Sequence, residues 1–282
     1  DGHIWANTII DLKPGKAIRL SRNKGKQVSL LHASRHKILA AWSKSVEGGN
    51  LIVLSTISLS KTGLQAGKAK AVNLHKGKKN QTYPVLGKAG KSIGVIWEDR
   101  RRGHTALMYC KYQDNGKFTR PVLLNEIVKK SNKYGSGSGV TRVAVSNYGK
   151  KGIATTWMDK RNRSTGYDVF AALNNPSGFS FGKNQQVQDS FGDNLAQWNP
   201  AIAGNTQGDI VIAWYDSRED SMDIIISYKT ANGWSDDELV TPASGEGDQT
   251  NAVMIFDQQR NLHMVWIHQD KAAVGTKLYY SV

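Results

Sequence analysis

The chain has 282 residues, of which 38 are Lys or Arg and 23 are Asp or Glu, so its formal net charge is +15. Hydrophobic residues make up 39% and charged residues 22%, which is the composition of a globular protein and excludes a disordered chain. No apolar run approaches the roughly 18 residues of a membrane-spanning helix, so we expect no membrane span. The single cysteine, Cys110, excludes an internal disulfide.

The positive charge is concentrated in the first half of the chain. Residues 1–150 contain 28 Lys and Arg against 7 Asp and Glu, whereas residues 151–282 contain 10 against 16. A basic half attracts polymers that carry carboxylate, sulfate or phosphate, although a solvated lysine surface is the alternative interpretation. The lysine-rich stretch 61–79 has no interleaved aromatic residues. We therefore expect an acidic glycan as partner and no specific nucleic acid.

Tryptophans end short apolar runs at regular intervals along the chain. Trp42, Trp97, Trp157, Trp214 and Trp266 are separated by 55, 60, 57 and 52 residues. Each tryptophan belongs to a repeating unit of short strand-like runs. In the second unit, runs rich in Val, Ile and Tyr cover 82–87, 92–99, 105–112 and 120–125. In the third unit, comparable runs cover 140–146, 152–159 and 168–174. No segment shows a sustained helical period. The spacing predicts an all-β fold over 1–282: a single five-bladed β-propeller of four-stranded antiparallel blades.

The two ends of the chain complement each other in this scheme. The last unit ends at 277–282 after its third strand, and residues 1–10 read as a turn followed by one strand. We expect the N-terminal strand to complete the last blade and thereby close the ring.

Joined in this order, the ends read S-x-D-G-x-x-W across 281–282 and 1–5. This resembles the Asp-box of sialidase-like BNR-repeat propellers, and degenerate versions occupy 114–119, 177–180 and 232–235. In that family the boxes are structural turns, so the resemblance implies the fold and not the activity. Sialidases carry an arginine in an F/Y-R-I-P-like motif, and the corresponding segment 17–20 lacks both the aromatic residue and the proline. Sialidase activity is therefore not expected.

The pattern W-x-D-x-R occurs three times, beginning at Trp97, Trp157 and Trp214. Features that recur in several blades are expected to be architecture, with the aspartate capping a loop and the arginine bridging to the neighbouring blade. A polar binding ring is the alternative interpretation. The first and fifth units depart from the pattern, since Lys44 and His268 stand two residues after their tryptophans.

The starts of the innermost strands provide the candidate ligand site. These starts fall at 27–29, 81–83, 139–141, 197–199 and 249–251, and a glutamine opens four of them. Aromatic rings stack on sugars, while amide and guanidinium groups donate to hydroxyls and carboxylates. Packing between blades is the alternative role of the tryptophan. The predicted ligand-binding residues are Tyr83, Arg142, Gln197, Trp198, Asn199, Gln249 and Asn251.

We expect an exported, monomeric carbohydrate-recognition propeller, extracellular or periplasmic. The alternatives are a polysaccharide-acting glycoside hydrolase or lyase and a protein-interaction scaffold. Five-bladed glycosidases place paired carboxylates on innermost strands, where this sequence has neutral residues. The candidate catalytic residues are Tyr83, Asp193, Glu246, Asp248 and His268. No cofactor is expected, because the acidic segments 219–220 and 235–238 read as exposed turns rather than Ca²⁺ ligands.

Overall fold

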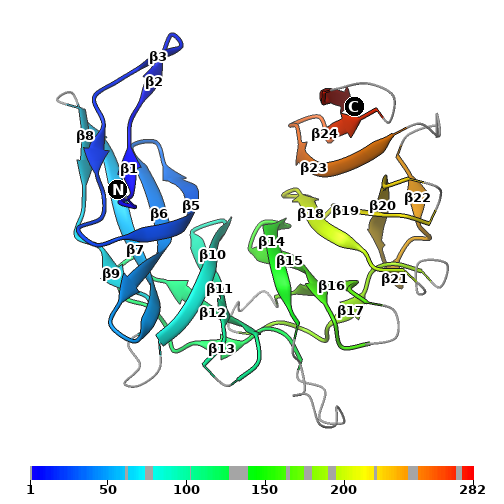
Figure 1. Ribbon diagram of the computed structural model, residues 1–282, viewed down its shortest axis with the longest axis horizontal. Coiled ribbons are helices and arrows are strands. Elements are labelled where there is room, and N and C mark those ends of the chain that lie inside the picture. Colours follow the sequence, from blue (N-terminus) through cyan, green and yellow to red (C-terminus); the bar gives the residue numbers. More distant parts are fainter. Residues whose placement is uncertain are drawn as a thin grey trace. The chain divides into compact units, whose positions relative to one another are not determined.

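The computed structural model describes residues 2–60, 63–73, 79–101, 103–126, 139–162, 166–174, 180–189, 195–218, 221–240, 247–270 and 275–282. All regular elements within these ranges are β-strands (Figure 1). The chain divides into two compact units. Unit 1 comprises Asp1–Lys88 and Ser92–Leu123, and unit 2 comprises Ala89–Lys91 and Leu124–Val282. Within the described ranges, no helix of the length and apolarity needed to cross a bilayer is present.

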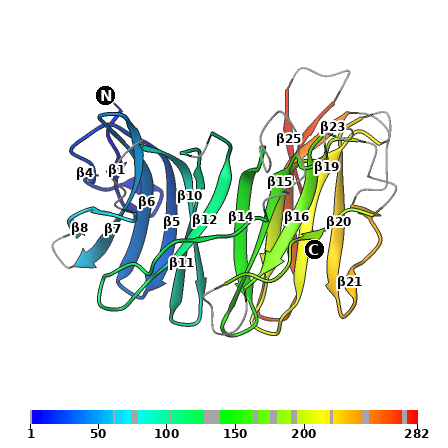
Figure 2. The same ribbon diagram turned by 90° about the horizontal axis from the view of Figure 1, so that it is seen from below.

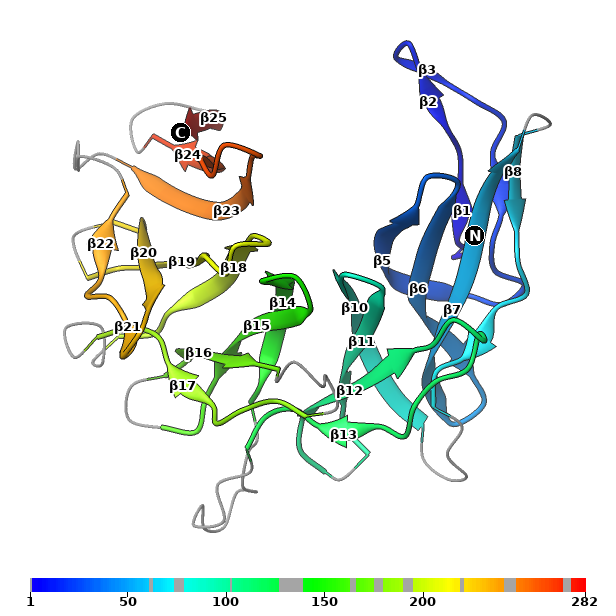
Figure 3. The ribbon, with the colours of Figure 1, turned by 180° about the vertical axis from the view of Figure 1, so that it is seen from behind.

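Unit 1 contains two antiparallel meanders, which we call repeat 1 and repeat 2. The strands of repeat 1 are β5 (Gly25–Ser34), β6 (Lys37–Val46), β7 (Gly49–Ser60), β8 (Gly63–Ala66) and β9 (Lys70–Ala71). Those of repeat 2 are β10 (Lys79–Ala89), β11 (Ser92–Asp99), β12 (Ala106–Tyr112) and β13 (Val122–Leu123). A short parallel pairing of β10 with β7 joins the meanders into one sheet, and Figure 3 shows β5, β6 and β7 following one another across it.

Unit 2 contains three further antiparallel meanders, repeats 3 to 5. Repeat 3 consists of β14 (Thr141–Tyr148), β15 (Gly152–Asp159), β16 (Asp168–Leu173) and β17 (Gln185–Gln186). Repeat 4 consists of β18 (Trp198–Gly204), β19 (Ile210–Asp216), β20 (Asp223–Thr230), β21 (Gly233–Trp234) and β22 (Glu238–Leu239). Repeat 5 consists of β23 (Asp248–Phe256), β24 (Leu262–Gln269) and β25 (Lys277–Ser281). The first strands β14, β18 and β23 are neighbours, and Figure 2 shows the strands of repeats 3 and 4 from a second direction.

The predicted tryptophan spacing corresponds to one buried indole on the second strand of each repeat. Trp42, Trp97, Trp157 and Trp214 are at most 1% exposed, and Trp266 is 4% exposed. In unit 2, for example, Trp214 packs with Ile202, Ile212 and Ile225 from three strands of repeat 4. Burying so large a ring stabilises each sheet by roughly 2–3 kcal/mol of transfer free energy. The repeat period is therefore a packing period.

The N-terminal strand pairs differently from the sequence-based expectation. β1 (Trp5–Ala6) pairs with β4 (Ile18–Arg19), and β2 (Ile9–Ile10) forms a hairpin with β3 (Lys13–Pro14). Burial of Ile4 explains this arrangement, because its side chain packs with Leu20 and Trp42 of unit 1. The predicted pairing partner, the last blade, is thus replaced by β4. Ring closure itself stays a prediction.

The Asp-box-like segments form turns, as expected. At 114–119 the amide of Lys117 donates to Asn115 Oδ1, and Gly116 adopts a positive φ of 74°. At 232–235 the Ser235 hydroxyl accepts from the amide of Tyr228, at 3.0 Å. Most of the box at 177–180, together with Asp1, lies outside the described residues.

Candidate functional site

Five innermost strands share one unusual backbone position near their start. Gln27, Tyr83, Arg142, Asn199 and Asn251 all have φ between 46° and 59°, in the left-handed region that disfavours residues with a β-carbon. β-Bulges accompany this position, with register shifts in β5, β14, β18 and β23. Such strain costs of order 1 kcal/mol per residue and concentrates at functional sites. The five positions are spaced 56, 59, 57 and 52 residues apart.

The shared backbone position corrects the predicted alignments of repeats 1 and 3. In repeat 3 the left-handed residue is Arg142, so Val140 and not Gly139 corresponds to the recurring glutamine. The sequence aligned Gln27 with Gln81, Gln197 and Gln249, but its φ aligns it with Tyr83, two residues later. The residue of repeat 1 that corresponds to the recurring glutamine is therefore Gly25. A two-residue error preserves the alternation of the strand, which is why hydrophobic pattern alone does not reveal it.

The recurring glutamines are buried; Gln81 and Gln197 hold backbone groups, and Gln249 holds a buried indole. Gln81 Oε1 accepts from the amide of Ile52 at 3.2 Å, and Gln197 Nε2 donates to the Leu195 carbonyl at 2.7 Å. Gln249 Oε1 accepts from the Trp266 indole at 2.9 Å. The structure places Gln197 and Gln249 beneath the surface, at 0% and 5% exposure, whereas the left-handed residues next to them reach it.

In unit 2 the left-handed residues converge on one end of the repeats, which we call the unit 2 mouth. The side chain of Asn199 lies between repeats 4 and 5: its Nδ2 donates to Tyr215 Oη at 2.7 Å and is 3.5 Å from Asn251 Oδ1. Its backbone amide contacts Met158 Sδ of repeat 3 at 3.3 Å. Arg142 and Asn251 are exposed. The mouth therefore presents two amides and a phenol hydroxyl, and the exposed Arg142 lies on the neighbouring strand β14.

An aromatic pair adjoins this mouth. Trp198, which is 36% exposed, meets Tyr167 edge to face at a centroid distance of 5.6 Å. Lys160 Nζ lies 5.5 Å from the Tyr167 ring centroid. A partly exposed indole held by a second ring is a surface on which a sugar ring can stack. Both interpretations of Trp198 apply, because it packs between strands and also reaches solvent.

Unit 1 carries two of the left-handed residues. The amide of Tyr83 donates to Gln27 Oε1 at 3.1 Å, so the side chain of one repeat supports the backbone of the next. The Tyr83 ring is 41% exposed. Its orientation is thus fixed by the backbone while its face stays open to a ligand.

The candidate catalytic residues are placed as follows. Asp248 Oδ1 accepts from the amide of Met222 at 3.1 Å, which gives this carboxylate a backbone-holding role. His268 is 8% exposed and lies edge-on to Tyr279, with centroids 4.8 Å apart. Asp193 and Glu246 lie outside the described residues. Within the described part of the chain, no group of three or more His, Cys, Asp or Glu side chains is arranged to hold a metal ion.

The W-x-D-x-R segments are architectural, as the sequence predicted. In repeat 4, Asp216 Oδ2 accepts from the Trp214 indole at 3.2 Å and from Arg218 at 2.7 Å, and Oδ1 accepts from the Arg218 amide at 3.1 Å. Asp99 and Asp159 make the corresponding bonds. The arginine hydrogen bonds lower the pKa of Asp99 despite its burial. Asp99 is therefore held ionised and does not suit a general-acid role.

Two of the three arginines, Arg161 and Arg218, continue outward to a second acceptor. Arg218 reaches Asp237 at 2.7 Å, and Asp237 exchanges backbone hydrogen bonds with Asp189 of the preceding repeat, both at 3.1 Å. In repeat 3 the same roles fall to Arg161 and Asn184. The predicted bridge between blades therefore runs mainly through this second acceptor, and Arg161 also reaches Glu126 directly at 3.8 Å.

Sequence reasoning missed two members of the unit 2 mouth, Tyr167 and Tyr215. Tyr215 stands next to Trp214 of the W-x-D-x-R pattern, and Tyr167 precedes the third strand of repeat 3. A signal was present, since the corresponding position beside Trp97 is Glu98 and beside Trp157 is Met158. This position varies between repeats, and variable positions were the ones expected to carry function.

Comparison with known proteins shows a likeness of fold. No protein-family model matches the sequence, and no curated protein matches it. A PL25 ulvan lyase superposes with a TM-score of 0.60 and 13% identity, over 92% of this chain and 72% of that one. An α-L-arabinanase of Penicillium chrysogenum, complexed with arabinobiose, gives 0.56 and 11% over 89% and 79%. A GH93 α-L-arabinofuranosidase of Fusarium graminearum gives 0.53 and 11% over 91% and 80%.

These neighbours are β-propeller enzymes, and the chain shares their all-β architecture of four- and five-stranded antiparallel sheets. The prediction of a propeller-type fold is confirmed at this level. At 11–13% identity the likeness carries no residue-by-residue assignment.

Proposed function

We propose that this protein cleaves polysaccharides that contain acidic sugars, and that the chain binds at the mouth formed by the left-handed residues. The proposal is carried by the Asn199–Tyr215 hydrogen bond next to the partly exposed Trp198, and by Arg142, which is exposed at the equivalent left-handed position of the neighbouring repeat 3. This combination stacks a sugar and pairs with its carboxylate. Arabinose-containing oligosaccharides occupy two of the structural neighbours, and a third is a polysaccharide lyase, which supports the substrate class.

Of the two cleavage reactions, we favour β-elimination from a uronic acid. Elimination needs a cation or amide to neutralise the carboxylate and an oxygen or nitrogen base to accept the adjacent C–H proton. The C–H electron pair then forms the carbon–carbon double bond as the glycosidic C–O bond breaks, and the departing oxygen takes up a proton. We assign carboxylate binding to Arg142 and proton transfer to the Tyr215 hydroxyl held by Asn199. Hydrolysis is the second candidate, because arabinan-cleaving hydrolases share the fold.

The test compares two products on panels of acidic and neutral polysaccharides. Elimination generates an unsaturated product that absorbs ultraviolet light together with a new reducing end, whereas hydrolysis generates the reducing end alone. We expect Arg142→Gln to lower kcat/KM on uronic-acid polymers roughly 10- to 100-fold, the cost of one charged hydrogen bond. Arg120→Gln, an exposed arginine on unit 1, serves as the charge-matched control.

Each outcome decides between the functions. Ultraviolet absorbance lost in Arg142→Gln and Tyr215→Phe supports elimination. New reducing ends without ultraviolet absorbance would show that the reaction is hydrolysis and not elimination. Asp193 and Glu246 are then the carboxylates to substitute next. Binding without turnover makes the protein a lectin-like recognition module, and the absence of both binding and turnover leaves a protein-interaction scaffold and overturns the proposal.

We also propose that repeats 1 to 5 are the blades of one closed, monomeric, exported propeller of the Asp-box type. The recurrence of the left-handed position supports five equivalent blades. Apolar side chains of repeat 5 also need a cover, since Val253, Ile255 and Leu278 are 71%, 68% and 77% exposed. A compact 282-residue domain has a radius of gyration of about 19 Å. Small-angle X-ray scattering that gives a clearly larger value would refute closure.

A further inference from the structure

The buried tryptophan of each repeat needs an acceptor for its indole N–H. Trp97, Trp157 and Trp214 donate to the aspartate two residues later, at 3.3, 3.0 and 3.2 Å. Trp266 lacks that aspartate and donates instead to Gln249, at 2.9 Å. Two positions therefore supply the acceptor in repeats 2 to 5: the second residue after the tryptophan, or the glutamine at the start of the innermost strand.

Repeat 1 has neither acceptor. Lys44 stands where the aspartate would be, and Gly25 stands where the glutamine would be. Trp42 is 1% exposed, and its Nε1 has no hydrogen-bond partner among the described residues. A β-carbon built on Gly25 would lie 2.7 Å from Trp42 Cδ1 and 3.1 Å from Nε1, so only glycine fits against this edge of the indole, and it offers no side-chain acceptor. A buried donor left unpaired costs roughly 1–3 kcal/mol.

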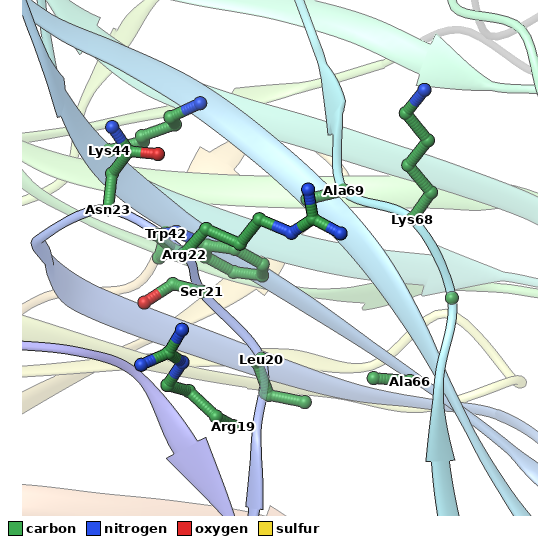
Figure 4. Close-up of a pocket in the computed structure, with 11 residues that line it drawn as sticks. Arg19, Leu20, Ser21, Arg22, Asn23, Trp42, Lys44, Ala66, Lys68 and Ala69 are labelled. Atoms are coloured by element: carbon green, nitrogen blue, oxygen red, sulfur yellow. The ribbon is translucent and has the colours of Figure 1, made fainter.

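A basic pocket of about 670 Å³ adjoins this tryptophan. Figure 4 shows Arg19, Arg22 and Lys44 around Ser21 and Trp42, with Lys68 on another segment. These four cations take part in none of the salt bridges of the described residues. The Ser21 hydroxyl accepts from the amide of Ile4 at 2.8 Å and keeps its own hydrogen for donation.

We propose that this pocket binds the sulfate or carboxylate group of an acidic sugar. An anion here takes the place of the aspartate carboxylate of the other repeats: one of its oxygens accepts the Trp42 indole N–H, and the surrounding guanidinium and ammonium groups balance its charge. Hydrogen bonds to charged groups are about twice as strong as neutral ones, which suits an incoming anion better than a neutral hydroxyl. The volume exceeds that of a lone sulfate and accommodates a sugar ring that carries the group.

This site is separate from the unit 2 mouth and is built wholly from residues of unit 1. The proposed pocket specifies which acidic group of the substrate the protein recognises. That this group belongs to a polysaccharide rests on the proposed function. Four of the basic residues that make residues 1–150 positively charged line this pocket.

The experiment monitors the indole N–H resonances of the eight tryptophans by ¹H–¹⁵N NMR. Sodium sulfate, sodium glucuronate and a sulfated disaccharide are titrated separately, with glucose as the neutral ligand and ionic strength fixed by NaCl. We expect a saturable downfield shift of the assigned Trp42 resonance, because its hydrogen gains an acceptor. The resonances of Trp97, Trp157 and Trp214 already have acceptors and should stay in place.

Two variants make the result specific. Lys44→Asp supplies the missing carboxylate, so the Trp42 resonance should shift without ligand and affinity should fall at least roughly tenfold. Arg35→Asp changes the charge equally in the turn between β5 and β6, away from Lys44, and should bind as the unmodified protein does. A response to sulfate but not glucuronate, or the reverse, identifies the group.

No Trp42 response to any anion overturns the site, as does an equal loss in the Arg35→Asp and Lys44→Asp variants. Arg142→Gln separates the two proposals. This variant should lose polysaccharide cleavage yet keep the Trp42 response, so failure of the mouth and failure of the pocket are distinguishable.

Discussion

Asp237 makes the stability of unit 2 dependent on pH in a way that one substitution can remove. Its side chain is 2% exposed, and burial raises its pKa from 3.8 to about 6 even though Arg218 donates to it. Repeat 3 fills the same role with Asn184, whose single Oδ1 accepts from the Glu126 amide at 2.6 Å and from Arg161 at 3.0 Å. Asp237→Asn therefore reproduces a geometry that the chain already uses.

The magnitude follows from the difference between the two pKa values. A folded-state pKa of about 6 against 3.8 unfolded corresponds to at most about 3 kcal/mol of unfolding free energy. Because the folded pKa is the higher one, this stability is fully present below pH 3.8 and is lost as pH rises through about 6. Asp237→Asn carries no titrating proton there, so its stability relative to the unmodified protein should grow by up to about 3 kcal/mol between roughly pH 4 and 7.

Urea unfolding at several pH values across that window measures the difference directly. Asp236→Asn is the matched control. The Asp236 side chain adjoins Asp237 in sequence but is exposed, so this substitution should leave the pH dependence of stability unchanged. A stability difference between Asp237→Asn and the unmodified protein that is constant from pH 4 to 7 would refute the reasoning. Equal pH effects in both variants would show that net charge, and not burial, is responsible.

Three further changes have expected outcomes. Asp216→Ala should cost about 3–5 kcal/mol in urea unfolding, since it strands a buried indole and an arginine; a loss below about 1 kcal/mol contradicts this. Tyr83→Gly relieves a left-handed backbone, so stability should stay within about 1 kcal/mol while polysaccharide affinity falls; unchanged affinity removes Tyr83 from the site. Burial raises the pKa of Cys110 to about 12, so iodoacetamide should label it only after unfolding, as mass spectrometry will show.

The architecture was predictable because its signals are repeated. Each tryptophan is recognisable from its own apolar run, and five occurrences at similar spacing exclude coincidence. The aspartate two residues after Trp97, Trp157 and Trp214 belongs to the same signal, since a buried indole and a buried arginine need the same carboxylate. Local chemistry and spacing both predict the repeats, and the structure confirms an all-β, propeller-type fold, whereas the closed five-bladed ring stays a proposal.

The site was less predictable because it depends on backbone conformation and on contacts far apart in sequence. No residue type announces a left-handed position at Tyr83 or Arg142, and the predicted alignment of Gln27 was wrong by two residues. The N-terminal strand pairs with Ile18–Arg19 because Ile4 enters the core beside Trp42, a contact 38 residues distant in the chain. Such contacts follow from packing volumes, which a pattern of apolar and polar residues does not record.

Our proposed anion site is at the one repeat that, among the described residues, lacks the indole acceptor shared by repeats 2 to 5. The carboxylate beneath each tryptophan is structural in three repeats, and an amide replaces it in repeat 5. At Trp42 the chain has a lysine and a glycine instead, although an acceptor at either position would remove the cost of an unpaired donor. We propose that the four basic side chains lining the pocket beside Trp42, which form no salt bridge with other described residues, favour an anion, because a ligand that brings its own negative charge also supplies the missing acceptor.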